Sequence, residues 1–148
     1  MRTQNCSRAP RGVQAISGQI KDWPGYDDAV AMQQYVVNIT GQGRVGVFHS
    51  NYLKSALVSS FQGGYGTDFY PTIADKIAVL IHAIITMHVF VDANKRTAMA
   101  LGLAVAEANG QRIRPLRDKE IEDLAVSVAD HTCDIPDIAK WLRFYYRF

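Results

Sequence analysis

The segment Thr72–Gly110, TIADKIAVLIHAIITMHVFVDANKRTAMALGLAVAEANG, decides the fold of this chain. Both halves are rich in apolar and small residues, which predicts two long helices over about 72–88 and 94–109. Thr72 and Asp75 have the spacing of a capping box at the start of the first helix. Apolar side chains surround most of that helix, so we expect it at the centre of the fold. The small residues of the second helix allow close packing against it.

Shorter helices are predicted on both sides of this pair, over about 27–37, 50–60, 118–128 and 136–147. The segment 61–70 is rich in glycine, and we expect a short hairpin or a loop there. No alternating apolar and polar run indicates a longer strand. The sequence therefore predicts an all-α fold.

Length and composition set the broad class. A chain of 148 residues is most simply one domain, 1–148, in which 1–45 form an N-terminal extension of unclear role. The formal net charge of +2 identifies no partner, and we expect no direct nucleic-acid binding. Two cysteines are too few for a disulfide framework and fit a reduced, cytoplasmic setting. The apolar stretches are shorter than the roughly 20 residues that span a bilayer, so no membrane association is expected.

Between the two long helices lies a run of chemically active side chains: His88, Asp92, Asn94, Lys95 and Arg96. The start of a helix exposes free N–H groups and positive charge, so cations there are unfavourable unless an anion binds. One loop would then hold a base, a metal ligand and phosphate-binding groups, with Phe90 anchored in the core. This combination indicates phosphoryl or nucleotidyl transfer. The competing interpretation is a plain helix–loop–helix corner with exposed cations.

Three other patterns favour structural interpretations. Residues 41–46 match GxGxxG, but no repeated strand–helix units follow, so we interpret them as a connecting loop. Residues 130–134 contain metal-ligand types without the paired spacing of a zinc site, which indicates a solvated turn. Trp141 and Tyr145 suggest base stacking, yet their helical spacing favours core packing.

Residues 88–96 read His-Val-Phe-Val-Asp-Ala-Asn-Lys-Arg, which resembles the signature His-x-Phe-x-Asp/Glu-Gly/Ala-Asn-Gly/Lys-Arg of the Fic/Doc family. The segment 51–76 is similar to the helix–flap–helix run of its Doc (death-on-curing) toxin branch. The resemblance covers about 48–110 as a Fic/Doc core and leaves 118–148 as C-terminal helices. It implies the Fic/Doc helical fold with a short flap hairpin or loop near 61–70.

The resemblance also implies roles for single residues. His88 would take a proton from a target hydroxyl, and an imidazole suits this task because it titrates near neutral pH. Asp92 would hold Mg²⁺, which prefers carboxylate and phosphate oxygens. Asn94, Arg96 and the loop N–H groups would line an anion hole for ATP, and Lys95 would place a point charge against a phosphate.

The flap would lie beside this site and hold an extended target segment by backbone pairing. Its residues are Gly63, Gly64, Tyr65, Gly66, Thr67 and Asp68.

Two positions bear on the reaction. Lys95 and Met99 stand where family members that transfer AMP commonly have Gly and a second Arg. Both departures match the Doc branch. The resemblance therefore implies a toxin that transfers the γ-phosphoryl group of Mg-ATP to a Ser or Thr hydroxyl of a target protein. The target that the resemblance suggests is translation elongation factor Tu.

Two alternatives stay open. The same site would also suit AMP transfer, and an all-α domain without catalysis would act by binding or regulation. The inhibitory motif [Ser/Thr]-x-x-x-Glu-[Gly/Asn] of many relatives does not occur in the sequence. The resemblance therefore implies restraint by a separate antitoxin protein.

Overall fold

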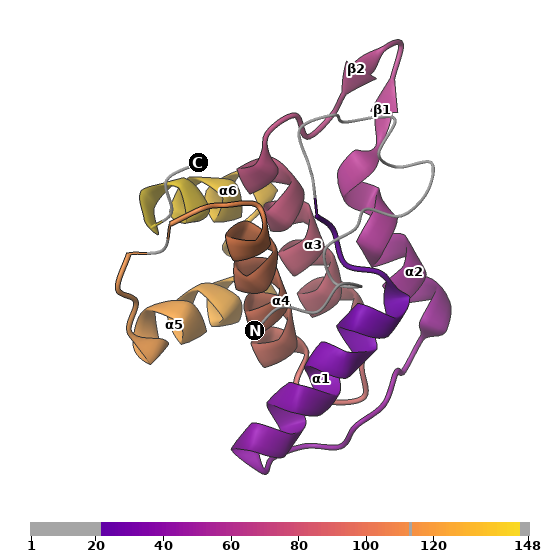
Figure 1. The fold of residues 1–148 in the computed structure, drawn as a ribbon, viewed down its shortest axis with the longest axis vertical. Helices are drawn as coiled ribbons and strands as arrows, with labels where there is room; N and C mark the ends of the chain where they lie inside the picture. The colour runs from indigo at the N-terminus through magenta and orange to yellow at the C-terminus, as the bar shows by residue number, and fades with distance from the viewer. Residues whose placement is uncertain (1–21, 113, 146–148) are drawn as a thin grey trace.

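The computed structural model describes residues 22–112 and 114–145. Its central element is α3 (Ile73–Met87), which contacts α2, α4, α5 and α6. The helix α4 (Asn94–Ala108) packs along it (Figure 1). Almost every apolar side chain of α3 is buried, which confirms the predicted central position of this helix.

Two helix pairs flank α3 and α4 (Figure 1). On one side lie α1 (Tyr26–Thr40) and α2 (Ser50–Val58), and on the other lie α5 (Asp118–Ala129) and α6 (Ile135–Tyr145). Apart from a small hairpin, the regular structure in the described part of the chain is helical, as the sequence predicts. None of the helices described is both long and apolar enough to cross a membrane.

Helix boundaries follow the local signals closely. The predicted capping box forms, because Thr72 Oγ1 accepts from the N–H of Asp75 at 3.1 Å and the Asp75 carboxylate accepts from the N–H of Thr72 at 3.3 Å. The helix predicted over 50–60 ends at Val58 and continues as the 3₁₀ turn η2 (Ser59–Phe61). The predicted end of the last helix, at 146–147, lies outside the described residues.

Part of the segment treated as an N-terminal extension belongs to the core. The side chain of Trp23 is fully buried, its indole N–H donates to the Leu57 carbonyl at 2.8 Å, and its ring meets Phe61 edge-on at 4.9 Å. The predicted close approach of the two long helices occurs at Gly102. A Cβ at this glycine would stand 2.7 Å from Ile81 Cδ1 and 2.9 Å from Ile81 Cγ1, so any larger residue would require the Ile81 side chain to shift.

The glycine-rich segment forms the predicted hairpin. Its strands β1 (Gly63–Gly64) and β2 (Thr67–Asp68) pair antiparallel, and the hairpin projects from the body of the molecule (Figure 1). The turn residues Tyr65 and Gly66 have φ of 53° and 76°. Positive φ at both central positions matches the right-handed twist of a two-residue hairpin.

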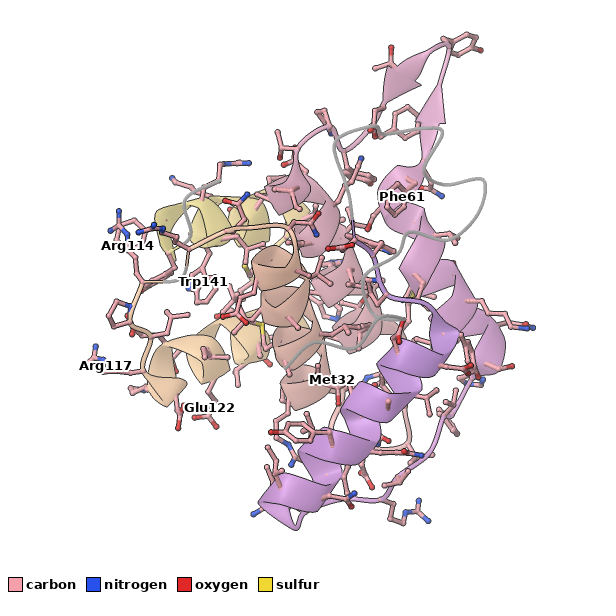
Figure 2. All side chains as sticks on the ribbon, viewed as in Figure 1. Met32, Phe61, Arg114, Arg117, Glu122 and Trp141 are labelled. Atoms are coloured by element: carbon pink, nitrogen blue, oxygen red, sulfur yellow. The ribbon has the colours of Figure 1, made fainter. Side chains whose placement is uncertain are left out.

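A buried lysine fixes the base of this hairpin. The ammonium group of Lys76, on α3, lies 2.7 Å from the Asp68 carboxylate and also donates to the carbonyls of Tyr70 and Ser60. Lys76 is fully buried, and its Nζ lies 5.3 Å from the centre of the Phe61 ring. Figure 2 labels Phe61, which lies just before the hairpin in the chain. The hairpin is thereby tied to the N-terminal half of α3.

Replacing Gly63 by Ala should open the hairpin, whereas replacing Gly64 by Ala should leave it closed. A Cβ at Gly63 would lie 2.4 Å from the Thr67 carbonyl oxygen, a backbone atom that cannot move aside alone. A Cβ at Gly64 would lie 3.6 Å from the end of the Phe69 ring, an ordinary contact. The check is the cross-strand NMR contact between residues 63 and 68. Equal loss or equal retention of this contact in both variants would contradict the prediction.

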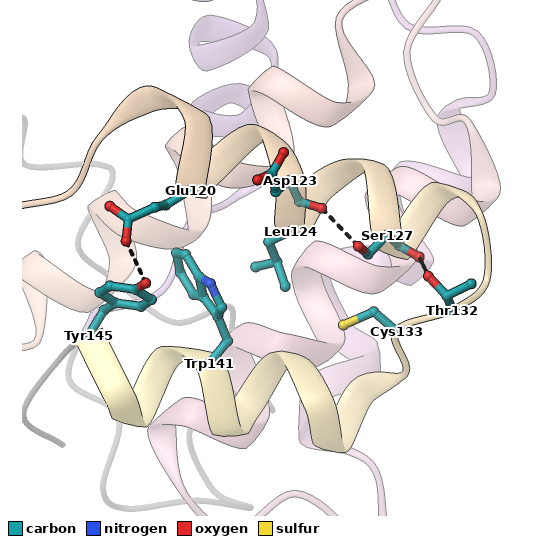
Figure 3. A pocket seen from close by; sticks show the side chains of 8 residues that line it. All are labelled: Glu120, Asp123, Leu124, Ser127, Thr132, Cys133, Trp141 and Tyr145. Atoms are coloured by element: carbon teal, nitrogen blue, oxygen red, sulfur yellow. Dashed lines mark hydrogen bonds between the residues drawn. The ribbon is translucent and has the colours of Figure 1, made fainter.

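A surface pocket of about 430 Å³ lies between α5 and α6 (Figure 3). Its lining includes Trp141, which packs against the core as predicted, and Tyr145, whose hydroxyl donates to the Glu120 carboxylate at 2.6 Å. None of the residues 88–96 borders it. This pocket is therefore separate from the predicted site.

Replacing Tyr145 by Phe should raise the pKa of Glu120. The hydrogen bond from the Tyr145 hydroxyl lowers the pKa of this carboxyl in the folded chain. A lowered folded-state pKa means that the contact stabilises the fold above the unfolded pKa, and that this contribution is lost as the pH falls through the folded value. A carboxyl ¹³C titration of both proteins measures the shift, with Glu122 as reference in the same spectra. An unchanged Glu120 midpoint would count against this cause.

Candidate active site

The loop between α3 and α4 begins and ends with residues in the left-handed conformation. His88 (φ 50°) caps the C-terminus of α3, and Ala93 (φ 62°) directly precedes α4. Residues with a Cβ rarely adopt positive φ, and those that do cluster at functional sites. The turn at His88 ends α3 and leaves the imidazole exposed.

The side chain of Asn94 closes this loop. Its Oδ1 accepts from the N–H of Phe90 at 2.9 Å, and its Nδ2 donates to the Phe90 carbonyl at 2.9 Å. The Phe90 side chain is buried, as predicted for the anchor of the loop. The Asn94 side chain thus holds the shape of the loop, and any contribution to an anion hole would come from its backbone N–H.

An extended segment, 46–49, covers one edge of the loop. Val47 and Phe90 form an antiparallel bridge, and the N–H of Phe48 donates to the Val89 carbonyl at 2.8 Å. The GxGxxG stretch is therefore a connecting loop between α1 and α2, as interpreted, and its last residue begins a segment that packs on the motif.

The carboxylate of Asp92 makes one hydrogen bond and one ion pair. Its Oδ2 accepts from the N–H of Arg44 at 2.8 Å, and the Arg44 Nε lies 3.8 Å from the same oxygen. The Asp92 side chain is 43% exposed, and its Oδ1 has no partner among the described residues. A partly exposed carboxylate is a suitable ligand for Mg²⁺, which commonly takes one or two carboxylates together with substrate phosphates.

The start of α4 carries two cations and lacks a cap. Ala93, at the N-cap position, provides no side-chain hydrogen bond, and the first turn contains no acidic residue. Lys95 is exposed, while the guanidinium of Arg96 donates to Thr40 Oγ1 and the Gln42 carbonyl at the end of α1. The free N–H groups, the helix dipole and the two cations make this helix end positive, which an anion would stabilise.

The structure separates the hairpin from this loop. The hairpin precedes the N-terminus of α3, whereas His88 follows its C-terminus (Figure 1). At about 1.5 Å per residue, the helix puts roughly 22 Å between them. The structure therefore does not bring Gly63–Asp68 next to His88, and a role of these residues in holding a target segment stays a prediction. In addition, the carboxylate of Asp68 is engaged by Lys76.

Two residues beside the motif were not predicted from the sequence. Arg44 contacts Asp92, and the buried amide of Gln33 donates to the Asp92 carbonyl at 3.1 Å. Gln33 is a polar residue on the buried stripe of α1, next to Ala29 and Val37. A glutamine within this apolar stripe is the sequence feature that could have marked it as a candidate site residue. Nothing in the local pattern marks Arg44.

Comparison with known proteins places these features in a family. The Fic/DOC family matches residues 19–106, which is more than half of the chain, so the protein belongs to the Fic/DOC family. The match begins ahead of the region 48–110 and includes α1. The protein named Toxin Doc from Mycolicibacterium smegmatis is 40% identical over 79 residues, which are 53% of this chain and 61% of that relative. The chain thus spans about three fifths of the length of this curated relative.

Proposed function

We propose that the protein is a Doc-like toxin that transfers the γ-phosphoryl group of ATP, bound with Mg²⁺, to a Ser or Thr hydroxyl of a target protein. The observation that carries the proposal is the uncapped, cationic start of α4 next to the exposed imidazole of His88. An anion site beside a base is the arrangement that phosphoryl transfer requires.

The reaction follows from these groups. His88 accepts the proton of the target hydroxyl, whose oxygen attacks the γ-phosphorus of ATP. The bond between this phosphorus and its bridging oxygen breaks, and ADP leaves. The N–H groups at the start of α4, together with Lys95 and Arg96, would stabilise negative charge on the transferred group.

Asp92 is the residue that would hold Mg²⁺. Among residues 22–112 and 114–145, no three His, Cys, Asp or Glu side chains gather into a metal site. One carboxylate, with an oxygen that no described residue engages, is nevertheless enough when nucleotide phosphates complete the ligand set. When bound, Mg²⁺ would neutralise charge on the phosphates.

Two residues favour phosphoryl transfer over AMP transfer. Met99 is 2% exposed and packs in the core, so this position contributes no second cation to a nucleotide. Lys95 adds bulk and charge where AMP-transferring relatives commonly have Gly. Both features support the orientation of ATP that presents its γ-phosphate to the loop.

The relationship to Toxin Doc suggests the biological setting. We expect a toxin–antitoxin pair in which a separate antitoxin protein restrains the enzyme. Translation elongation factor Tu is the first target to test, because the Doc branch resembled by this chain modifies a threonine of that protein.

Expression in bacteria tests the proposal. Wild-type protein should arrest growth, and a His88→Asn variant of equal abundance should not, because transfer needs the base. Arrest by both proteins would show action through binding alone. Unimpaired growth with the wild-type protein would overturn the toxin assignment.

A further inference from the structure

A buried glutamine joins three parts of the site. The Gln33 side chain, on α1, is 1% exposed. Its Nε2 donates to the carbonyls of Asp92 at 3.1 Å and Arg44 at 2.9 Å, and its Oε1 accepts from the N–H of Gly46 at 3.1 Å. Both N–H donors of the amide and one side of its oxygen are therefore used, so it is well satisfied for a buried group.

These contacts form a closed arrangement around Asp92. Gln33 holds the Asp92 backbone from one side. It also holds the backbone of Arg44, whose N–H in turn donates to Asp92 Oδ2 at 2.8 Å. One amide thus restrains the main chain of Asp92 directly and its carboxylate through Arg44. The remaining oxygen, Oδ1, accepts no hydrogen bond from residues 22–112 or 114–145.

We propose that Gln33 is a positioning residue that presents the Asp92 carboxylate to the Mg²⁺ of Mg-ATP. This inference rests on the proposed function. Partners that orient a metal-binding side chain are worth about 10- to 100-fold in metal affinity or activity. Gln33 suits this task because α1 is a rigid element packed against α4, and a buried side chain has little freedom to move.

The chemistry of the side chain makes glutamine specific here. Methionine fills similar space but offers neither donors nor an acceptor to the three backbone groups. Asparagine keeps the amide but is one methylene shorter, so it would not span from α1 to both carbonyls. Either change should free residues 43–46 from the motif without removing any group that touches nucleotide.

The test compares Gln33→Met and the milder Gln33→Asn with a matched variant, Asn109→Leu. Asn109 also bonds a distant backbone through both amide atoms, donating to the Asp22 carbonyl at 2.8 Å and accepting from its N–H at 3.3 Å. It lies at the opposite end of α4 from the loop. Calorimetry with Mg-ATP, and with ATP in the presence of a chelator, measures binding in all four proteins.

We expect both Gln33 variants to bind Mg-ATP about 10- to 100-fold more weakly, with metal-free ATP affected far less and Asn109→Leu near wild type. Amide hydrogen exchange without nucleotide gives a second readout. The N–H groups of Arg44 and Val91, which bond Asp92 Oδ2 and the Gly46 carbonyl, should exchange faster only in the Gln33 variants.

The two readouts separate the inference from the proposed function. Unchanged exchange in both Gln33 variants would overturn the restraint of Asp92, whatever the enzyme does. Faster exchange with unchanged Mg-ATP binding would overturn the positioning role. If wild-type protein binds no Mg-ATP, the proposed function is wrong, and so is the role of Gln33 toward Mg²⁺. Amide hydrogen exchange would still show whether Gln33 restrains Asp92.

Discussion

Replacing His88 by Asn should slow phosphoryl transfer by about 100- to 10,000-fold, the usual contribution of a general base. The side chain is exposed and contacts no other described residue by hydrogen bond or ion pair. The substitution should therefore change the free energy of unfolding little. Asn also tolerates the left-handed conformation that His88 adopts at φ 50°. Transfer rates measured with the purified protein, and urea unfolding of both forms, check the two halves of this prediction.

His131 provides the matched control for this substitution. It is likewise exposed and left-handed, with φ 62°, but lies in the turn between α5 and α6. The variant His131→Asn should retain the wild-type rate. Comparable rates for His88→Asn and the wild-type protein would remove His88 from the reaction.

Replacing Asp68 by Ala should lower the free energy of unfolding by about 3 kcal/mol, because it leaves a buried ammonium group without its counter-ion. Lys76 has no exposed side-chain surface, and Asp68 is its only acidic partner in the described part of the chain. The two carbonyls that remain bonded to Lys76 do not neutralise its charge. Urea unfolding monitored by circular dichroism measures the loss.

A double variant distinguishes this cause from simple loss of hairpin contacts. Adding Lys76→Met to Asp68→Ala removes the ammonium group that has lost its counter-ion. The double variant should recover at least half of the lost free energy of unfolding, since apolar replacements of buried ion pairs are often well tolerated. A single variant that loses less than about 1 kcal/mol would show that the pair is not an important stabilising contact. A double variant less stable than the single one would exclude charge burial as the cause.

Most of the fold was predictable from the sequence because its signals are local. The apolar character of residues 72–88 indicates a central helix, the Thr72–Asp75 box marks its start, and the glycine-rich segment 61–70 indicates the hairpin. The reactive loop was also visible, since its groups lie within nine consecutive residues, from His88 to Arg96.

The contacts that complete the site were not predictable in this way. Gln33 and Arg44 reach Asp92 across 59 and 48 positions of the chain, and no local pattern encodes such a pairing. The position of the hairpin relative to the loop was not predictable for a related reason. Residues 63–68 are close to α3 in sequence, but they adjoin the end of that helix opposite to His88.

The most direct measurement is label transfer from ATP to bacterial proteins, run in parallel with γ-labelled and α-labelled nucleotide and with His88→Asn as the control. Transfer of the γ-label alone, lost in the variant, is the result that a phosphoryl-transferring Doc-like enzyme predicts. Transfer of the α-label would contradict this conclusion and show that the loop donates AMP despite Lys95 and the buried Met99.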